Sequence, residues 1–530
     1  MAKVEQLRPG PPGHPQARGA PEAGAPPSAT YALSPLDQPT RASSAPELAA
    51  AFGRELAEQR VLFDGMNLVD LAHTVELMEE GVIPLEAGAA LLAALLDLVR
   101  GSADFKADPA LGDLYVNRQA WLNSRTSAAG WLGAGRARRE CTTTAYHLIV
   151  RARLLTLAQA LLDACGALLE RAASYRDALM TDYTYLQPAQ PTTFGHYLVG
   201  FAYPLLRDLD RVRALFGRTN LSPAGCGATS GSTVLRDRER LASLLGFDGL
   251  VTHARDAMWQ ADLPIETVAV ATAACISQSR LAEDLQVFAT TEFGLVDLDQ
   301  AHSRTSAVMP QKKNPYALAY VRGIANQLIG MLASTASSAR TPTGQVDNRL
   351  FVYGNVPWAL EAAAEAIALM AGVVERLRLN SARANSSLES GFTTATDLAE
   401  AIMGKGRLDF ARAHMVVSRL ARNLAARGLG ARDTTLHDVE QAARDVGAPE
   451  IGLSEQALKR ALDARAAIAS RVATGGAASA ALERMVDECR ARLDQHAVWR
   501  SRTASNLHAA EQRLLKHAGE RSRTQPCPST

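Results

Sequence analysis

Residues 146–174 read YHLIVRARLLTLAQALLDACGALLERAAS, and this segment is the clearest sign of the fold class. Its apolar residues run too long and too continuously for a β-strand, so they predict an α-helix of roughly 40 Å, at about 1.5 Å per residue. Comparable segments lie at residues 194–216, 265–293, 316–339 and 356–377. Five long apolar helices imply a bundle with a shared core, and the sequence therefore predicts an all-α protein.

The composition agrees with packed helices, since 47% of the 530 residues are hydrophobic and only 5% are aromatic. The 56 Lys and Arg residues balance 55 Asp and Glu residues, so the net charge of +1 creates no field that would attract nucleic acid or an anionic membrane. The six cysteines lack the spacing of a zinc site or a disulfide framework. Without a signal-peptide pattern or an uninterrupted apolar run of about 20 residues, we expect a cytoplasmic protein outside membranes.

Changes in composition divide the chain into five parts. Residues 1–40 are rich in Pro, Gly and Ala and are expected to form a disordered tail. We expect an N-terminal helical domain at residues 41–145, the central bundle domain at 146–390 and a C-terminal helical domain at 391–500. Residues 501–530 are charged and are expected to form a frayed tail.

A polar segment, SRTSAVMPQKKNP at residues 303–315, interrupts the helical pattern. Two prolines bar an ordinary helix across it, so Ser306, Lys312 and Asn314 are expected in a loop or at a helix entrance. There they can hold a carboxylate beside a hydroxyl group. Ser306 has no Gly-x-Ser-x-Gly sequence around it, so acyl transfer is not supported. The alternative interpretation is an ordinary surface turn.

Two further segments interrupt the helices near residues 140 and 225. Residues 135–144 place Arg138 and Arg139 at a helix start, where an arginine pair can bind carboxylates. Taken alone, a basic turn in solvent is the simpler interpretation. Residues 220–232 are rich in glycine, so the backbone can approach a ligand closely, but they lack the lysine of a phosphate loop.

The fourth polar segment, DYTYLQPAQP at residues 182–191, contains Thr184, Tyr185 and Gln187. By itself it predicts only a loop before a helix, because two prolines and two glutamines precede an apolar run.

Together these segments resemble the aspartase/fumarase superfamily, and within it argininosuccinate lyase most closely. The likeness covers roughly residues 45–500. It rests on sequences that occur in the family's order, namely T-x-LQ-x-AQP at residues 184–191, the glycine-rich stretch at 225–231, MPQKKNP at 309–315, ATDLA at 395–399 and KG at 405–406.

The resemblance implies a three-domain lyase fold whose long helices form a twenty-helix core in a homotetramer, with each active site built from loops of three subunits. It also implies elimination from a succinyl-type dicarboxylate, without metal or cofactor, that usually releases fumarate. The serine of the signature loop takes the Cβ proton, and fixed donors stabilise the carbanion as an aci-carboxylate. By position, Ser306 becomes the base, Lys312 and Asn314 bind carboxylate, Thr184 contacts the substrate, and Arg138 takes the place of the family's arginine.

Several positions depart from argininosuccinate lyase. Arg139 replaces an asparagine, and Tyr185 replaces a histidine linked to leaving-group protonation. The signature loop opens with Arg304 and Thr305, where Thr-Gly is usual. Residues 345–351 lack the tyrosine, glutamine and lysine that grip the arginine half of the substrate.

A further departure lies in the N-terminal helices, where Asp70 stands in place of a usual serine, beside a retained His73. The candidate catalytic residues are Ser306 and Tyr185. The candidate substrate-binding residues are Arg138, Arg139, Thr184, Gln187, Arg304, Thr305, Lys312 and Asn314.

These departures spare the proton-abstracting loop and remove groups for a guanidino leaving group. We therefore predict a specialised carbon–nitrogen lyase, acting for example on an N-substituted aspartate or on nitrosuccinate. The alternatives are an authentic argininosuccinate lyase, a non-catalytic tetrameric homologue, and a cycloisomerase that acts on a carboxymuconate-type substrate.

Overall fold

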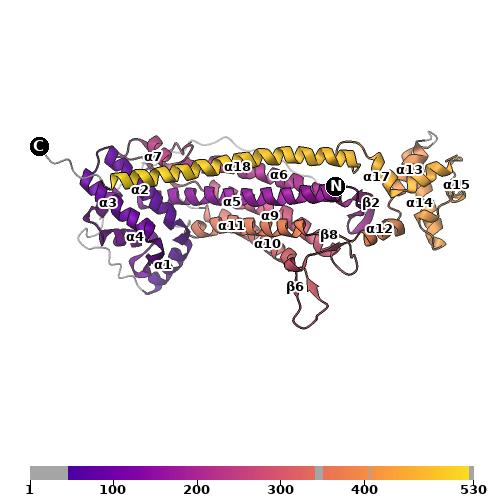
Figure 1. The fold of residues 1–530 in the computed structure, drawn as a ribbon, viewed down its shortest axis with the longest axis horizontal. Helices are drawn as coiled ribbons and strands as arrows, with labels where there is room; N and C mark the ends of the chain where they lie inside the picture. The colour runs from indigo at the N-terminus through magenta and orange to yellow at the C-terminus, as the bar shows by residue number, and fades with distance from the viewer. Residues whose placement is uncertain (1–45, 341–349, 405–407, 524–530) are drawn as a thin grey trace, which may run out of the picture. The chain divides into compact units, whose positions relative to one another are not determined.

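The computed structural model describes residues 46–340, 350–404 and 408–523, which belong to one compact unit, Ser44–Thr530. The tail predicted at residues 1–40, residues 345–349 and the KG sequence at 405–406 lie outside these ranges. Helices predominate, as the sequence predicts (Figure 1). They are α1 (Pro46–Gln59), α2 (Phe63–Glu79), α3 (Leu85–Arg100), α4 (Leu114–Asn123), α5 (Arg138–Ser174), α6 (Phe194–Thr219), α7 (Arg238–Leu244), α8 (Ala254–Met258), α9 (Asp262–Phe288), α10 (Tyr316–Ser338), α11 (Val352–Glu375), α12 (Ser381–Ser390), α13 (Ala395–Met403), α14 (Phe410–Ala426), α15 (Leu436–Asp445), α16 (Glu455–Leu462), α17 (Ala464–Ser470) and α18 (Ser479–Arg521).

The strands of the described residues are short and pair two by two. Strand β1 pairs antiparallel with β2, β3 pairs parallel with β4, β5 antiparallel with β8, and β6 antiparallel with β7. Their bounds are β1 (Leu179–Thr184), β2 (Gln187–Thr193), β3 (Leu221–Ser222), β4 (Gly249–Leu250), β5 (Val296–Asp297), β6 (Arg304–Thr305), β7 (Lys313–Asn314) and β8 (Arg378–Leu379).

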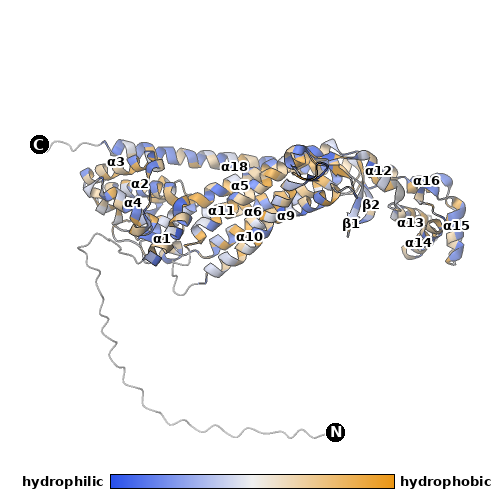
Figure 2. Cartoon of the chain, turned by 90° about the horizontal axis from the view of Figure 1, so that it is seen from below, coloured by the Kyte–Doolittle hydropathy of each residue, from blue (hydrophilic) through white to orange (hydrophobic). Residues whose placement is uncertain are grey.

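The five long segments predicted as helices are α5, α6, α9, α10 and α11. α5 packs against α6 and α11, and α9 packs against α10 and α11. Leu154, Leu161 and Leu168 of α5 are buried at intervals of seven residues, so one face of the helix enters the core. Each such leucine contributes about 1.5–3 kcal/mol on burial. Figure 2 shows hydrophobic positions gathered along α5, α6 and α9.

α5 and α11 are each long and apolar enough to cross a bilayer, but 67% of the tested window of each is buried within the bundle. Such burial is what core helices of a bundle show, so length and composition alone do not make them membrane spans.

One hydrophobic core joins the N-terminal helices, the bundle and α18. The boundary predicted at residue 145 therefore falls inside α5, whose first two turns pack against α2. A separate core is formed by α13, α14, α15 and α16, within the region predicted as the C-terminal domain. The β1–β2 hairpin and α12 lie next to this second core (Figure 1).

The tail predicted at residues 501–530 is wrong for residues 501–521, which continue α18 as one helix of 43 residues. Ala510, Leu514 and Ala518 are buried there, and α18 packs along α5 and α6. Their spacing of four places them on one helix face, while the other positions are mostly polar or charged. This narrow apolar stripe was hidden by the charged residues around it.

Candidate active site

The signature segment forms a hairpin in which β6 and β7 pair Arg304 with Asn314 and Thr305 with Lys313. The backbone N–H of Ser306 extends this ladder by donating to the carbonyl oxygen of Lys312 at 3.3 Å. Asn314 donates through Nδ2 to the carbonyl oxygen of Arg304 at 3.0 Å, which holds the two strands together. The structure thus brings five candidate residues into one hairpin, which projects from the bundle in Figure 1.

The Ser306 hydroxyl oxygen accepts two backbone hydrogen bonds. The N–H groups of Val308 and Met309 lie 3.2 Å and 3.0 Å from Oγ. Donors that point at an oxygen stabilise negative charge on it, so Ser306 remains the candidate base of the hairpin.

The two adjacent lysines of the hairpin differ in their environment. The Lys313 ammonium binds the carboxylate of Asp297 at 3.0 Å and the carbonyl oxygen of Leu298. Hydrogen bonds from Arg378 and then Lys313 lower the pKa of Asp297. Lys313 therefore anchors the hairpin to β5, whereas Lys312 is exposed and its ammonium group has no hydrogen-bond or ion-pair partner among the described residues. Lys312 is the lysine that remains available for a carboxylate.

The segment predicted as a loop at residues 182–191 is instead the tip of the β1–β2 hairpin, so that prediction was wrong. Thr184 pairs with Gln187, and the two residues between them, Tyr185 and Leu186, have φ values of 54° and 58°. Two left-handed residues make a tight turn that matches the twist of the strands. The Tyr185 side chain is 99% exposed, so in a single chain it contacts neither Ser306 nor the arginines.

Arg138 and Arg139 lie in the first turn of α5, as predicted. Arg138 forms an ion pair with Asp113 at 2.9 Å and stays 44% exposed, and Arg139 lies 4.0 Å from Glu55. The carboxylate pair on this side partly neutralises the two guanidinium groups. Both arginines remain candidates for substrate binding, with Arg138 the more accessible.

The first turn of α5 is tied to the glycine-rich segment by Glu140. Its two carboxylate oxygens accept the N–H groups of Gly225 and Gly227 at 2.9 Å and 2.6 Å. Burial raises the pKa of Glu140, while these two donors act in the opposite direction. Gly227 has a φ of 65°, and a Cβ there would lie 2.4 Å from the carbonyl oxygen of Gly231. Glycine is therefore required for this approach.

A buried ion cluster lies behind the arginines and was not predicted from the sequence. The Asp70 carboxylate, fully buried in α2, binds Arg118 at 2.6 Å and also Arg136. Burial alone would raise the pKa of Asp70, but the two guanidinium groups outweigh it and lower the pKa. The neighbouring His73 is also buried, which lowers its pKa well below the usual range and keeps the ring neutral.

Arg118 is the residue of this cluster that sequence reasoning missed. Leu114, Arg118 and Leu122 are spaced by four in α4, and all three are buried. An arginine flanked at both i±4 positions by buried leucines lies on the core face of its helix, which was the available signal.

Cys141 and Cys226 lie in candidate segments but are fully buried, and burial raises the pKa of both thiols. Neither is an activated thiolate. Within the described ranges, no group of three or more His, Cys, Asp and Glu side chains is placed to hold a metal ion.

The candidate residues fall into separate groups in one chain. Arg138 starts α5, and Tyr185 follows the other end of that helix, which is 37 residues long and thus spans about 55 Å. The hairpin with Ser306, formed by β6 and β7, is a third group. The length of α5 thus keeps Arg138 and Tyr185 of one chain too far apart for one small substrate to contact both.

Most of the chain is similar to known lyases. A family model described as Lyase matches residues 41–330, and one described as Argininosuccinate lyase C-terminal matches residues 392–469. The argininosuccinate lyase of Methanoculleus marisnigri is 32% identical over 85% of this chain and 92% of its own length. The argininosuccinate lyase of Archaeoglobus fulgidus is 33% identical over 79% of this chain and 85% of its own length.

Among solved structures, a variant of EDDS lyase with bound fumarate is similar at a TM-score of 0.83 and 30% identity, covering 91% of this chain and 97% of that chain. EDDS lyase in complex with formate is similar at a TM-score of 0.82 and 29% identity, with the same coverage.

Proposed function

The chain belongs to the aspartase/fumarase superfamily and is a carbon–nitrogen lyase, and on this premise we propose that it eliminates a nitrogen-linked group from a succinyl-type substrate. The product would be fumarate. The observation that carries this proposal is the pair of backbone N–H groups on Ser306 Oγ, inside a hairpin that also presents Lys312.

In the proposed reaction, Ser306 as an alkoxide removes a proton from the Cβ carbon of the substrate. The electron pair left on carbon spreads into the adjacent carboxylate, which becomes an aci-carboxylate, and Lys312 stabilises its charge. The pair then forms the carbon–carbon double bond while the bond from Cα to nitrogen breaks. The departing nitrogen takes up a proton, for which the Tyr185 hydroxyl is the candidate donor.

Arg138, Arg139, Thr184 and Gln187 are proposed to hold the second carboxylate and the nitrogen substituent. Asn314 uses one N–H to close its own hairpin and retains a second for a carboxylate. The guanidinium carbon of Arg304 lies 5.8 Å from the centre of the Tyr316 ring. This contact holds the Arg304 side chain next to the first residue of α10.

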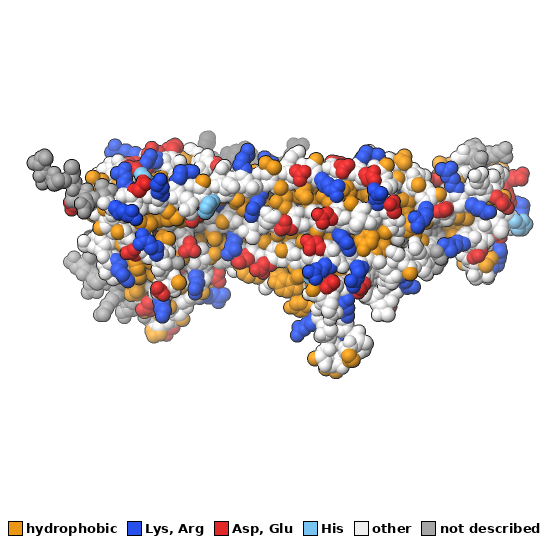
Figure 3. Space-filling model, viewed as in Figure 1, with side chains coloured by type: hydrophobic (Ala, Val, Ile, Leu, Met, Phe, Trp, Pro, Cys, Tyr) orange, Lys and Arg blue, Asp and Glu red, His pale blue; other side chains and the backbone are white. Residues whose placement is uncertain are grey.

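We further propose that the protein works as a homotetramer whose sites combine segments of different subunits. Three large side chains of α10, Tyr316, Tyr320 and Ile329, are between 37% and 52% exposed. Figure 3 shows hydrophobic surface beside the base of the projecting hairpin. Large apolar side chains exposed in this way favour packing against another chain. Cytoplasmic conditions fit the five described cysteines, which are buried and unpaired.

The substrate class is proposed from the departures at Arg139 and Tyr185 together with the similarity to EDDS lyase. An N-substituted aspartate without a guanidino group fits a site that has an extra arginine and lacks the histidine. Argininosuccinate is the second candidate, because the C-terminal region matches the argininosuccinate lyase model.

The test is fumarate release, followed by ultraviolet absorbance, from a panel of N-substituted aspartates, nitrosuccinate and argininosuccinate. Ser306→Ala should abolish release from whichever compound is a substrate. Ser303→Ala is the matched control, because the Ser303 hydroxyl only donates to the carbonyl oxygen of Asp299. Equal turnover by wild type and Ser306→Ala would eliminate the assigned role of Ser306.

A further inference from the structure

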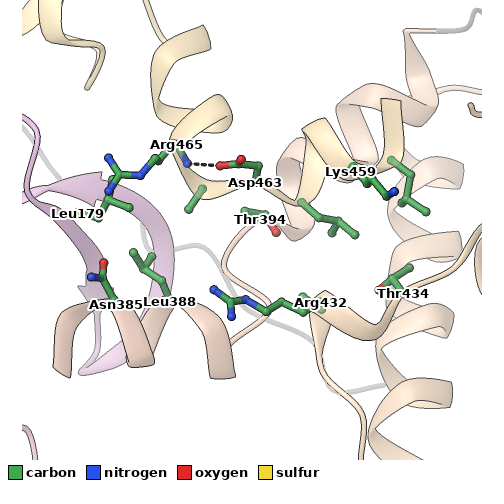
Figure 4. A pocket seen from close by; sticks show the side chains of 13 residues that line it. Leu179, Asn385, Leu388, Thr394, Arg432, Thr434, Lys459, Asp463 and Arg465 are labelled. Atoms are coloured by element: carbon green, nitrogen blue, oxygen red, sulfur yellow. Dashed lines mark hydrogen bonds between the residues drawn. The ribbon is translucent and has the colours of Figure 1, made fainter. Parts of the chain in front are cut away.

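A cavity of about 550 Å³ lies between the base of the β1–β2 hairpin and the separate C-terminal core. None of the ten candidate active-site residues lines it. Its wall comes from β1 and α12 on one side and from α16, α17 and the segment before α15 on the other (Figure 4). The residues that line it are Leu179, Asn385, Leu388, Thr394, Ala431, Arg432, Thr434, Leu458, Lys459, Leu462, Asp463, Ala464 and Arg465.

Three of the lining side chains carry positive charge. Arg432 and Arg465 reach the opening from opposite sides in Figure 4, and Lys459 extends from α16. No acidic side chain of the described residues forms an ion pair with Arg465. Lys459 lies 4.0 Å from Glu455, but both side chains are more than 75% exposed, so water weakens that pair.

The one acidic side chain of the lining, Asp463, is already used. Its carboxylate accepts the backbone N–H groups of Arg465 and Ala466 at 2.7 Å and 3.2 Å, and so caps α17. Because the single carboxylate is turned toward the backbone, it does not neutralise the positive charges of Arg465 and Lys459 at this cavity.

The inner part of the cavity is apolar. Leu388 and Leu458 are buried side chains that form part of its floor.

We propose that this cavity binds a small organic anion, in which carboxylate or phosphate groups are carried on an apolar body. The volume lies within the range of about 300–1,000 Å³ that is typical of small-molecule sites, and it exceeds what a single inorganic anion fills. The cationic rim recognises the anionic groups, and the leucine floor holds the apolar part. This inference does not depend on the proposed elimination reaction.

Occupancy would link two parts of the molecule. Leu179 is the first residue of β1, and α12 contacts the same strand through Ser387, which donates to the Thr181 hydroxyl at 3.2 Å and is hydrogen-bonded to the Tyr183 hydroxyl at 3.0 Å. A ligand that contacts β1, α12 and α16 together would hold the second core against the hairpin that bears Tyr185. Binding should therefore raise the melting temperature of the whole chain.

The experiment uses the full chain with phenyl phosphate and benzene-1,3-dicarboxylate as probes, and inorganic phosphate for comparison. Isothermal titration and thermal melting should detect binding of at least one organic probe. The probe that binds with the higher affinity shows whether the cavity prefers phosphate or carboxylate. Inorganic phosphate should bind more weakly, because it leaves the leucine floor unused.

Arg465→Glu and Lys459→Glu should each weaken the better probe by roughly tenfold or more, since each reverses a charge at the rim. Arg460→Glu is the matched control, because Arg460 is an exposed neighbour on α16 outside the cavity lining. A double variant, Ser306→Ala with Lys312→Ala, should keep the binding. The proposal is overturned if neither organic probe binds at up to about 10 mM, if both rim reversals bind like wild type, or if the double variant alone loses binding.

Discussion

Replacing Asp70 by asparagine tests the buried ion cluster behind the candidate arginines. The substitution keeps the shape of the side chain but removes the carboxylate that forms ion pairs with both Arg118 and Arg136, each of which is 1% exposed. Breaking a buried ion pair by removing one partner costs about 3–5 kcal/mol, because the remaining charge stays in a medium of low polarity. Two guanidinium groups lose their partner here, so we expect a loss in the upper part of that range.

The assay is urea unfolding at fixed protein concentration, with the free energy of unfolding compared between variant and wild type. Asp210→Asn is the matched control, because Asp210 also contacts two basic side chains, Arg492 and His496, at 3.1 Å each, but is 56% exposed. Its loss should remain below about 1 kcal/mol. A value for Asp70→Asn no larger than that of the control would refute the assignment of Asp70 as the anion of a buried cluster.

Three further predictions concern other parts of the chain. Burial raises the pKa of Glu76 from the usual 4.5 to about 7. Between these two pH values the folded protein holds a proton that the unfolded chain has lost, so the free energy of unfolding falls as the pH rises. Urea titrations between about pH 5 and pH 8 should therefore show a smaller loss of stability for Glu76→Gln than for wild type. Gly227→Ala should destabilise by about 1–3 kcal/mol through its left-handed φ and the blocked approach to Gly231, whereas Gly130→Ala, where a Cβ meets nothing within 4 Å, should not. Because Leu514 is buried in the core, Leu514→Ala should lower the free energy of unfolding by about 2–4 kcal/mol. An unchanged urea midpoint would instead support the interpretation of residues 501–521 as a frayed tail.

The long helices could be predicted because their apolar residues repeat over many turns. The predicted segment at 316–339 agrees with α10 to within one residue, and the segment at 356–377 begins four residues inside α11. Residues 501–521 were missed because their apolar stripe lies among many polar and charged residues and consists partly of alanine. Helix ends were less certain, since capping and packing set them rather than periodicity.

The β1–β2 hairpin could not be predicted from local signals. Its turn places Tyr185 and Leu186 in left-handed conformations that sequences usually reserve for Gly, Asn or Asp. Two bulky residues in such a turn carry strain that the surrounding structure must hold.

The candidate site could be predicted only in its local parts. The sequence around residues 303–315 correctly placed Ser306 and Lys312 together, because both lie in one short hairpin. The ion-pair partners of Asp70, Arg118 and Arg136, lie 48 and 66 residues away in the sequence, so no local sequence pattern predicts these contacts. Glu140 likewise meets its partners only after folding, at 85 and 87 residues' separation.

Subunit complementation tests most directly whether Ser306 and Arg138 act in one site that is built between chains. Ser306→Ala and Arg138→Ala, each inactive alone, are produced together in equal amounts, and fumarate release is measured on the purified mixed tetramers. If the two residues come from different chains, about one quarter of the sites combine two intact contributions, and activity should return to roughly that fraction of wild type. If the mixed tetramers remain as inactive as either variant, the proposed assembly of the site is contradicted.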